Sequence, residues 1–149
     1  MANKRFLVVE DHRSTSVVVV DSLRSFFPGW KISQAASEKE ALQKILDERP
    51  DVVILDIALP DGNGLNIVRK LAKNPWEIKP GLVVVTAFSD KATEGPRLGR
   101  PWLDQLEADE RRLVTAFFEK PFRWRGFLTA LAQAGRVPDP EAVATFQDY

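Results

Sequence analysis

The segment Asp51–Ile57 (DVVILDI) constrains the fold of this chain more than any other part of its sequence. Its interior is apolar and rich in β-branched residues, and it lacks the alternation typical of a strand with one face in water. A strand of this kind is buried on both faces, as in a parallel sheet that helices cover on both sides. Leu82–Thr86 shows the same pattern, and Phe6–Val9 is a third apolar run, with charged residues on both sides. The sequence therefore predicts a parallel sheet with a two-sided core.

Longer segments with helical spacing of apolar residues separate the strands. The predicted strands are Phe6–Val9, Trp30–Ala35, Asp51–Ile57, Leu82–Thr86 and Val114–Phe118. The predicted helices are Arg13–Phe27, one that follows the N-cap Ser37 and stops before Pro50, Leu65–Ala72, Trp102–Arg112 and Phe122–Ala134. This alternation favours the α/β class, with a doubly wound, five-stranded parallel sheet, flanking helices and an extended segment between the fourth and fifth strands.

Three of these helices carry predictions about single side chains. The sequence SEKE at 37–40 fits a capping box, with Ser37 as the N-cap and Glu40 three residues later. Side chains expected to face the core share helical spacing. They are Val17, Val20, Leu23 and Phe27 in the first helix, Ala41, Leu42, Ile45 and Leu46 in the second, and Phe127, Leu128 and Leu131 in the last.

Length and composition exclude several classes of protein. The 149 residues suit one domain, which we expect at 1–134, with a tail or short helix at 135–149. Lys+Arg and Asp+Glu are both 21, so the chain lacks the broad basic surface of a nucleic-acid binder, and we expect no nucleic-acid partner. The chain has no Cys and one His, which excludes disulfides, thiolate zinc sites and cysteine nucleophiles. No stretch approaches the ~20 apolar residues of a membrane span. The N-terminal segment MANKRFLVVED has no long apolar run and no small-residue cleavage site, so we do not expect it to act as a signal peptide. We therefore expect a cytoplasmic protein without a membrane partner.

Side chains able to do chemistry follow four of the predicted strands. Glu10 and Asp11 follow the first, Asp56 ends the third, and Thr86 and Lys120 lie at the ends of the fourth and fifth. Ligands of open parallel sheets bind beyond the carboxyl ends of the strands, so these residues are expected to converge. Crowded carboxylates repel one another, and a hard cation such as Mg²⁺ relieves that repulsion. A carboxylate beside Mg²⁺ can attack a phosphoryl group and form an aspartyl phosphate, with the lysine and threonine contacting the phosphoryl oxygens.

Four segments of the sequence also resemble the receiver domains of two-component response regulators, a family with a flavodoxin-like fold. They are FLVVEDH, DVVILDIALPDGNGL, VVVTAF and FFEKPF, in this order. The resemblance covers residues 5–134. It rests on the acidic pair, on an Asp with Pro four and Gly eight residues later, on Thr-Ala and on Lys-Pro.

The resemblance implies a role for each matching position. It makes Asp56 the phosphoacceptor and implies metal binding by the carboxylates of Glu10, Asp11 and Asp56 and by the backbone carbonyl of Ala58. The remaining implied roles belong to Thr86 as the switch hydroxyl, Phe117 as the rotating aromatic, Lys120 as the phosphate-sensing lysine with a cis bond to Pro121, and Ala58 and Phe88 as neighbours of the path of the hydrolytic water.

The function implied is a phosphorylation-controlled signalling switch in a two-component phosphorelay. Asp56 accepts a phosphoryl group, with Mg²⁺, from a sensor histidine kinase or a phosphotransfer protein. The expected downstream partner is a protein, and a homodimer is a further option. The domain is expected to be a self-phosphorylating and autodephosphorylating switch rather than a turnover enzyme. The stretch from Thr86 to Lys120 is roughly a dozen residues longer than is usual in the family. Because function often lies on loops held by a rigid scaffold, Asp90–Arg112 is expected to carry partner specificity.

Several other classes of protein compete with this interpretation. A haloacid dehalogenase phosphatase also uses an Asp nucleophile but needs a second Asp two residues later, where Ala58 stands. A P-loop nucleotidase needs GxxxxGK[ST], which the chain lacks. A receiver-like interaction module that is never phosphorylated, and a receiver fragment of a longer regulator or hybrid kinase, stay open. His12 is expected at the surface or the start of a helix, not as a phosphoacceptor.

Overall fold

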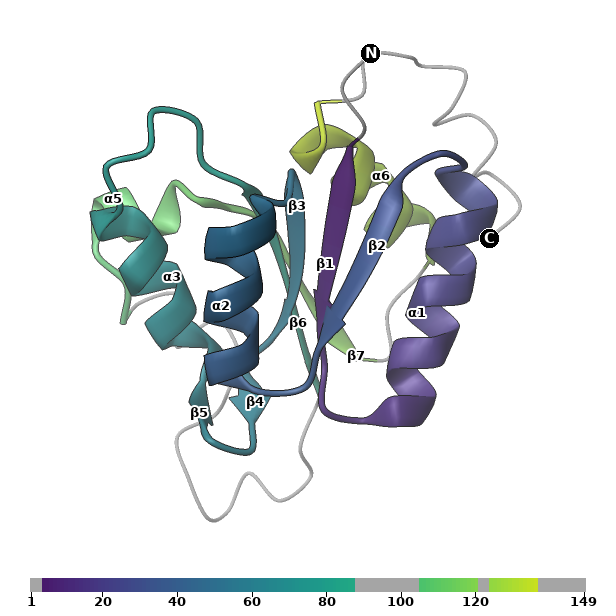
Figure 1. The fold of residues 1–149 in the computed structure, drawn as a ribbon, viewed down its shortest axis with the longest axis horizontal. Coiled ribbons are helices and arrows are strands. Elements are labelled where there is room, and N and C mark those ends of the chain that lie inside the picture. Colours follow the sequence, from purple (N-terminus) through teal and green to yellow (C-terminus); the bar gives the residue numbers. More distant parts are fainter. Residues whose placement is uncertain (1–3, 88–104, 121–123, 137–149) are drawn as a thin grey trace.

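Five parallel strands form the central sheet of this computed structural model, which describes residues 4–87, 105–120 and 124–136. The strand order is β2-β1-β3-β6-β7 (Figure 1). The bounds are Arg5–Val9 for β1, Lys31–Ala35 for β2, Val52–Asp56 for β3, Gly81–Ala87 for β6 and Val114–Lys120 for β7. This is the flavodoxin-like order, in which the second strand lies outside the first, and it confirms the predicted fold class.

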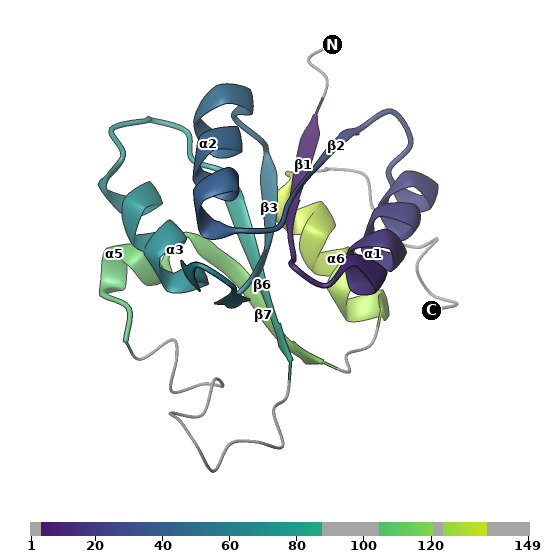
Figure 2. The same ribbon diagram turned by 60° about the horizontal axis from the view of Figure 1, so that its bottom comes forward.

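Helices cover both faces of the sheet (Figures 1 and 2). On one face lie α1 (Arg13–Phe26) and α6 (Trp124–Ala134). On the other lie α2 (Glu38–Glu48), α3 (Gly64–Lys73) and the short α5 (Ala108–Arg111). Among the described helices, none is long and apolar enough to cross a membrane.

The strands build two cores at once because successive side chains point to opposite faces. In β1, Leu7 and Val9 join the core beneath α2 and α3, whereas Phe6 and Val8 join the core beneath α1 and α6. All five residues of β3 are buried. The all-apolar pattern of the sequence thus has the physical cause assigned to it: neither face of the central strands meets water.

Of the four side chains predicted to face the core from the first helix, Val20, Leu23 and Phe27 are buried and the prediction is wrong for Val17. Val17 is 48% exposed, and the stripe that faces the core begins at Ser16 and continues through Val19, Val20 and Leu23. Ser16 Oγ donates a hydrogen bond to Gln34 Oε1 at 2.8 Å, which satisfies its buried hydroxyl. Four consecutive valines at 17–20 have no periodicity that selects a face, and serine is a residue type found mostly at the surface.

Two further predictions about the helices are corrected. Leu46 was placed on the buried face of α2 but is 55% exposed, while Ala41 and Ile45 are buried and Leu42 is partly buried. The helix predicted at Trp102–Arg112 is wrong in its described part, because residues 105–107 are not helical and α5 spans only Ala108–Arg111. Glu107 is the N-cap of α5, and it forms a capping box with Glu110 that fixes this later start.

The end of the sheet opposite the acidic residues is rich in cations. A pocket of about 230 Å³ there is lined by Lys4, Arg49, Lys79 and Arg136, which we call the basic end. Lys4 Nζ donates to Gly135 O at 2.9 Å and Lys79 Nζ donates to Ala72 O at 2.8 Å. These carbonyls close α6 and α3, so the cations complement the negative ends of two helix dipoles.

Several predictions concern parts of the chain outside the described residues. These are the position of Phe88, the bond to Pro121, the tail from residue 137 onward and residues 90–104 of the extended segment.

Candidate functional site

Three carboxylates meet at the carboxyl edge of the sheet. Asp56 is the last residue of β3, and Glu10 and Asp11 follow β1, its neighbour, which pairs with β3 up to Val9 and Leu55. One ligand atom from each of these acids, and one from His12, all lie within 4.8 Å of one another. The pairing of two parallel strands is thus what brings residues 45 positions apart in the sequence (56 minus 11) to one point. We call Glu10, Asp11 and Asp56 the acidic cluster.

Two members of the acidic cluster are buried. Glu10 is 7% exposed and Asp56 is 4% exposed. Carboxylates that are both crowded and removed from water are costly to keep charged unless a cation or hydrogen bonds compensate. All the donors of the acidic cluster are hard oxygens, the ligands that Mg²⁺ prefers. The cluster therefore fits a divalent cation of that kind.

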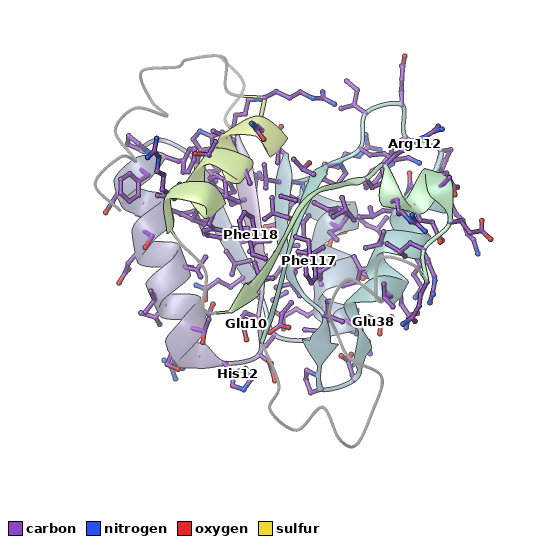
Figure 3. All side chains as sticks on the ribbon, turned by 180° about the vertical axis from the view of Figure 1, so that it is seen from behind. Glu10, His12, Glu38, Arg112, Phe117 and Phe118 are labelled. Atoms are coloured by element: carbon purple, nitrogen blue, oxygen red, sulfur yellow. The ribbon has the colours of Figure 1, made fainter. Side chains whose placement is uncertain are left out.

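His12 adds a nitrogen to the edge of the acidic cluster. Its backbone N–H donates to Glu10 Oε1 at 3.1 Å, and its Nδ1 lies 3.0 Å from Glu10 Oε1 and 3.1 Å from Asp11 Oδ1 (Figure 3 labels Glu10 and His12). The hydrogen bond to Glu10, followed by the charge of Asp11, raises the pKa of His12 above its usual 6.5. His12 is the N-cap of α1 and is 69% exposed, as expected of a residue at a helix start. Its contacts with the acids were missed, although its position directly after the acidic pair could have indicated them.

The predicted hydroxyl and lysine belong to the same edge by strand register. Asp56 pairs with Val85 of β6, the residue before Thr86. Ala87 pairs with Lys120 of β7, so the last residues of both strands reach this edge. The side chains of Thr86 and Lys120 lie outside the part of the chain that the structure describes, as does Phe88.

Phe117 and Phe118 lie on opposite faces of β7 (Figure 3). Phe117 is partly buried and packs against the core beneath α2 and α3. Phe118 packs against the other core, edge-on to Phe127 at 5.7 Å between ring centroids. Phe117 is therefore a half-buried side chain on the strand that ends with Lys120.

Gly64 allows α3 to begin beside the backbone of Asp56. Its N–H donates to Ile57 O at 2.9 Å. A Cβ at this position would lie 2.8 Å from Asp56 O, closer than real Cβ atoms approach, and 3.0 Å from Ile57 Cα, which is unusually tight. The glycine eight residues after Asp56 is thus required by close approach of two backbones.

A small hairpin connects Asp56 to α3. It consists of β4 (Ala58–Leu59) and β5 (Gly62–Asn63), which pair antiparallel. Asp61 lies between these strands, and its Oδ1 accepts from Glu38 N at 2.7 Å while its Oδ2 accepts from Lys39 N at 3.1 Å. The predicted loop at 60–64 therefore contains a strand, and Asp61 is a residue that the sequence interpretation passed over. No local pattern relates it to α2, because the two segments meet only in the folded chain.

The predicted N-cap of α2 is confirmed. Ser37 Oγ accepts a hydrogen bond from Glu40 N at 3.1 Å. Together, Ser37 and Asp61 satisfy three of the backbone N–H groups that a helix N-terminus leaves without a partner.

Comparison with known proteins finds the same family that the sequence motifs resemble. A family model of the response regulator receiver domain matches residues 6–99. The probable transcriptional regulatory protein TcrX of Mycobacterium tuberculosis is 36% identical over 88 residues, which are 59% of this chain and 35% of TcrX. Sporulation initiation phosphotransferase F of Bacillus subtilis is 25% identical over 82% of this chain and 86% of its own. The chain thus spans about a third of TcrX and most of the phosphotransferase.

Solved structures share the fold. The non-phosphorylated HemR receiver domain from Leptospira biflexa aligns with a TM-score of 0.67 at 24% identity, over 93% of this chain and 98% of its own. The chemotaxis response regulator CheY4 of Vibrio cholerae aligns with a TM-score of 0.65 at 20% identity, over 89% of this chain and 99% of its own. At these identities the likeness supports the fold alone.

Proposed function

The chain belongs to the response regulator receiver domains, and from that membership we propose that it is a phosphorylation-controlled signalling switch that accepts a phosphoryl group on Asp56. The observation that carries the proposal is the acidic cluster itself. The carboxylate of Asp56 ends the most deeply buried strand and lies within 4.8 Å of ligand atoms of Glu10 and Asp11. A cation bound there would sit beside a buried carboxylate at the end of β3.

The chain's own residues would act by position and charge. A carboxylate oxygen of Asp56 attacks the phosphorus of a phosphohistidine on the partner, the P–N bond breaks, and its electron pair stays on the imidazole. The acidic cluster and the backbone carbonyl of Ala58 would hold Mg²⁺, and the bound ion would neutralise charge on the phosphoryl oxygens. Lys120 neutralises the same oxygens and Thr86 donates a hydrogen bond to one of them. The proposed donor is a sensor histidine kinase or a phosphotransfer protein.

The signal would leave the site through the added charge. An acyl phosphate carries nearly two negative charges where the Asp56 carboxylate carried one, and its phosphoryl oxygens attract Thr86 and Lys120. Phe117 is half-buried on the strand that carries Lys120, so it can exchange a surface position for a core position as that strand responds. The downstream protein partner would read this change.

The test is phosphorylation by a small-molecule phosphodonor in Mg²⁺, followed by intact-mass spectrometry. Wild type should gain one phosphoryl group, and Asp56→Asn should gain none. Asp21→Asn removes an exposed carboxylate on α1 and serves as the matched control, which should be modified as wild type is. A wild type that stays unmodified would favour the alternative of a receiver-like interaction module that is not phosphorylated.

The lifetime of the phosphorylated state is a second part of the proposal. Ala58 and Phe88 stand two residues after Asp56 and Thr86, and neither side chain can donate or accept a hydrogen bond. Neither can orient the hydrolytic water, so we expect slow dephosphorylation, with a partner phosphatase or back-transfer needed to reset the switch. The decay of phosphorylated protein is compared with that of the double variant Ala58→Asn, Phe88→Glu. A wild type that decays as fast as this variant contradicts the expectation.

A further inference from the structure

The hairpin that follows Asp56 is too small to hold itself in place. Its ladder consists of two residue pairs, Ala58 with Asn63 and Leu59 with Gly62. A two-stranded hairpin of this size has no independent stability in water, so anchors outside the hairpin must fix its position. The structure provides an apolar anchor in Leu59, which is 8% exposed, and a polar anchor in Asp61.

Asp61 ties the hairpin to a rigid element. Both of its carboxylate oxygens accept backbone N–H groups of α2, at 2.7 Å from Glu38 and 3.1 Å from Lys39. Helix α2 is itself fixed to the sheet through buried Ala41 and Ile45. The two oxygens bind two successive N–H groups, which restrains both the position and the rotation of the carboxylate.

Capping of α2 alone does not explain Asp61. Ser37 already provides the local cap by accepting from Glu40 N. Asp61 lies more than twenty residues away in the sequence and bonds the two N–H groups that Ser37 leaves. These two bonds, Glu38 first, also lower the pKa of Asp61 below its usual 3.8, so the anchor is ionised at neutral pH.

We propose that Asp61 is a positioning residue for the cation site: by fixing the hairpin to α2 it holds the backbone carbonyl of Ala58 where the acidic cluster can share a cation with it. This rests on the proposed function, since that function assigns the carbonyl to the metal. The hairpin starts two residues after Asp56, and Gly64 N bonds Ile57 O behind it. Movement at Asp61 is therefore passed to Ala58 through only two intervening residues, Leu59 and Pro60.

The experiment compares Asp61→Ala with Ser37→Ala. Each variant removes side-chain hydrogen bonds from the N-terminus of α2, but only Asp61→Ala releases the hairpin. Both should melt at a similarly reduced temperature. Asp61 is exposed at the surface, so its variants are expected to fold. Mg²⁺ affinity, measured by calorimetry on the full chain, should fall about threefold to tenfold in Asp61→Ala, at or below the low end of known outer-shell effects on metal sites, and should stay unchanged in Ser37→Ala. Asp61→Asn keeps the acceptor for Glu38 N and should recover part of the affinity.

A metal-free measurement separates this inference from the proposed function. Hydrogen exchange of the Gly64 amide, which bonds Ile57 O, should quicken severalfold in Asp61→Ala beyond any change in Ser37→Ala. If wild type binds no Mg²⁺, the proposed function fails, whatever the exchange shows. If wild type binds Mg²⁺ and the two alanine variants match in affinity or in exchange, Asp61 is only a second helix cap and the inference is overturned.

Discussion

Replacing Gly64 by alanine should damage the fold at the point where α3 meets the phosphoacceptor strand. The added Cβ would lie 2.8 Å from Asp56 O, 3.0 Å from Ile57 Cα and 3.2 Å from Leu55 Cγ. Carbon contacts are favourable only near 3.5–4.0 Å, and two of these neighbours are backbone atoms that cannot rotate away. Overpacking of this kind costs about 1–3 kcal/mol. The better helix propensity of alanine, at most ~1 kcal/mol in a helix interior, offsets little at the first residue of α3.

Gly126 provides the matched substitution. It is the third residue of α6, and a Cβ there would meet only Phe118 Cε1, at an ordinary 3.6 Å. Gly126→Ala should therefore stabilise the protein by up to ~1 kcal/mol through helix propensity and a less flexible unfolded chain. Replacing glycine by alanine should thus lower the free energy of unfolding at Gly64 and raise it at Gly126.

Thermal and urea unfolding, followed by circular dichroism, measure both effects. For a chain of this size 1 kcal/mol moves the melting temperature by about 2–4 °C, so a 2 kcal/mol loss in Gly64→Ala lowers it by about 4–8 °C. Gly126→Ala should raise it by up to about 4 °C. The slope of urea unfolding should not change, because neither variant alters the surface exposed on unfolding. If Gly64→Ala is as stable as wild type, the close approach of α3 to Asp56 is not a constraint and the reasoning is refuted.

Three further predictions follow from local contacts. The single His gives one assignable ring signal, so an NMR titration of metal-free protein should show a His12 pKa above 6.5, and Glu10→Gln should lower it; an unchanged pKa in that variant would contradict the hydrogen bond. Because folding raises the pKa of His12, protonated His12 stabilises the folded protein below the pKa of the unfolded chain. That contribution to stability is lost as the pH rises through the pKa of the folded protein. Leu23→Ala empties a fully buried site and should cost about 2–5 kcal/mol, whereas Leu46→Ala, at an exposed site on α2, should stay within about 0.5 kcal/mol; equal losses in urea unfolding would mean that α2 is turned differently. Gly29 has φ of +88° and open space around it, so Gly29→Ala should cost on the order of 1 kcal/mol through backbone conformation alone, and unaltered stability would show that the turn relaxes.

The sequence allowed the fold to be predicted where one force dominated. Burial on both faces makes the interiors of β3 and β6 apolar, at 52–55 and 82–85. The order of such strands and helices leaves few topologies. The acidic cluster could be predicted equally well, because residues at the ends of neighbouring parallel strands must lie close together. What escaped prediction depends on contacts between distant segments. The burial of Ser16 instead of Val17 is accompanied by a hydrogen bond to Gln34, and the contacts of Asp61 involve a helix more than twenty residues earlier.

The edge strand β7 shows a different limit. Phe117 and Phe118 alternate between two cores, which follows from strand geometry once the strand is known. The short α5 could not be placed in the same way. Its start depends on the capping box of Glu107 and Glu110. The apolar residues upstream predicted a longer helix, but residues 105–107 are not helical.

The acidic cluster and the basic end lie at opposite ends of the sheet, so a net charge of zero does not mean that the charge is evenly distributed. Its formal net charge is +0, yet the acidic cluster lies at one end of the strands, while four cations and the single acid Asp51 line the pocket at the other. The seven residues of β6 span about 23 Å, nearly three screening lengths at physiological salt. An approaching molecule therefore senses mainly the end that it meets, which is acidic at the acidic cluster and has an excess of cations over Asp51 at the basic end. Encounter rates should depend on ionic strength with opposite sensitivity for partners of opposite charge, a behaviour that the isoelectric point alone would hide.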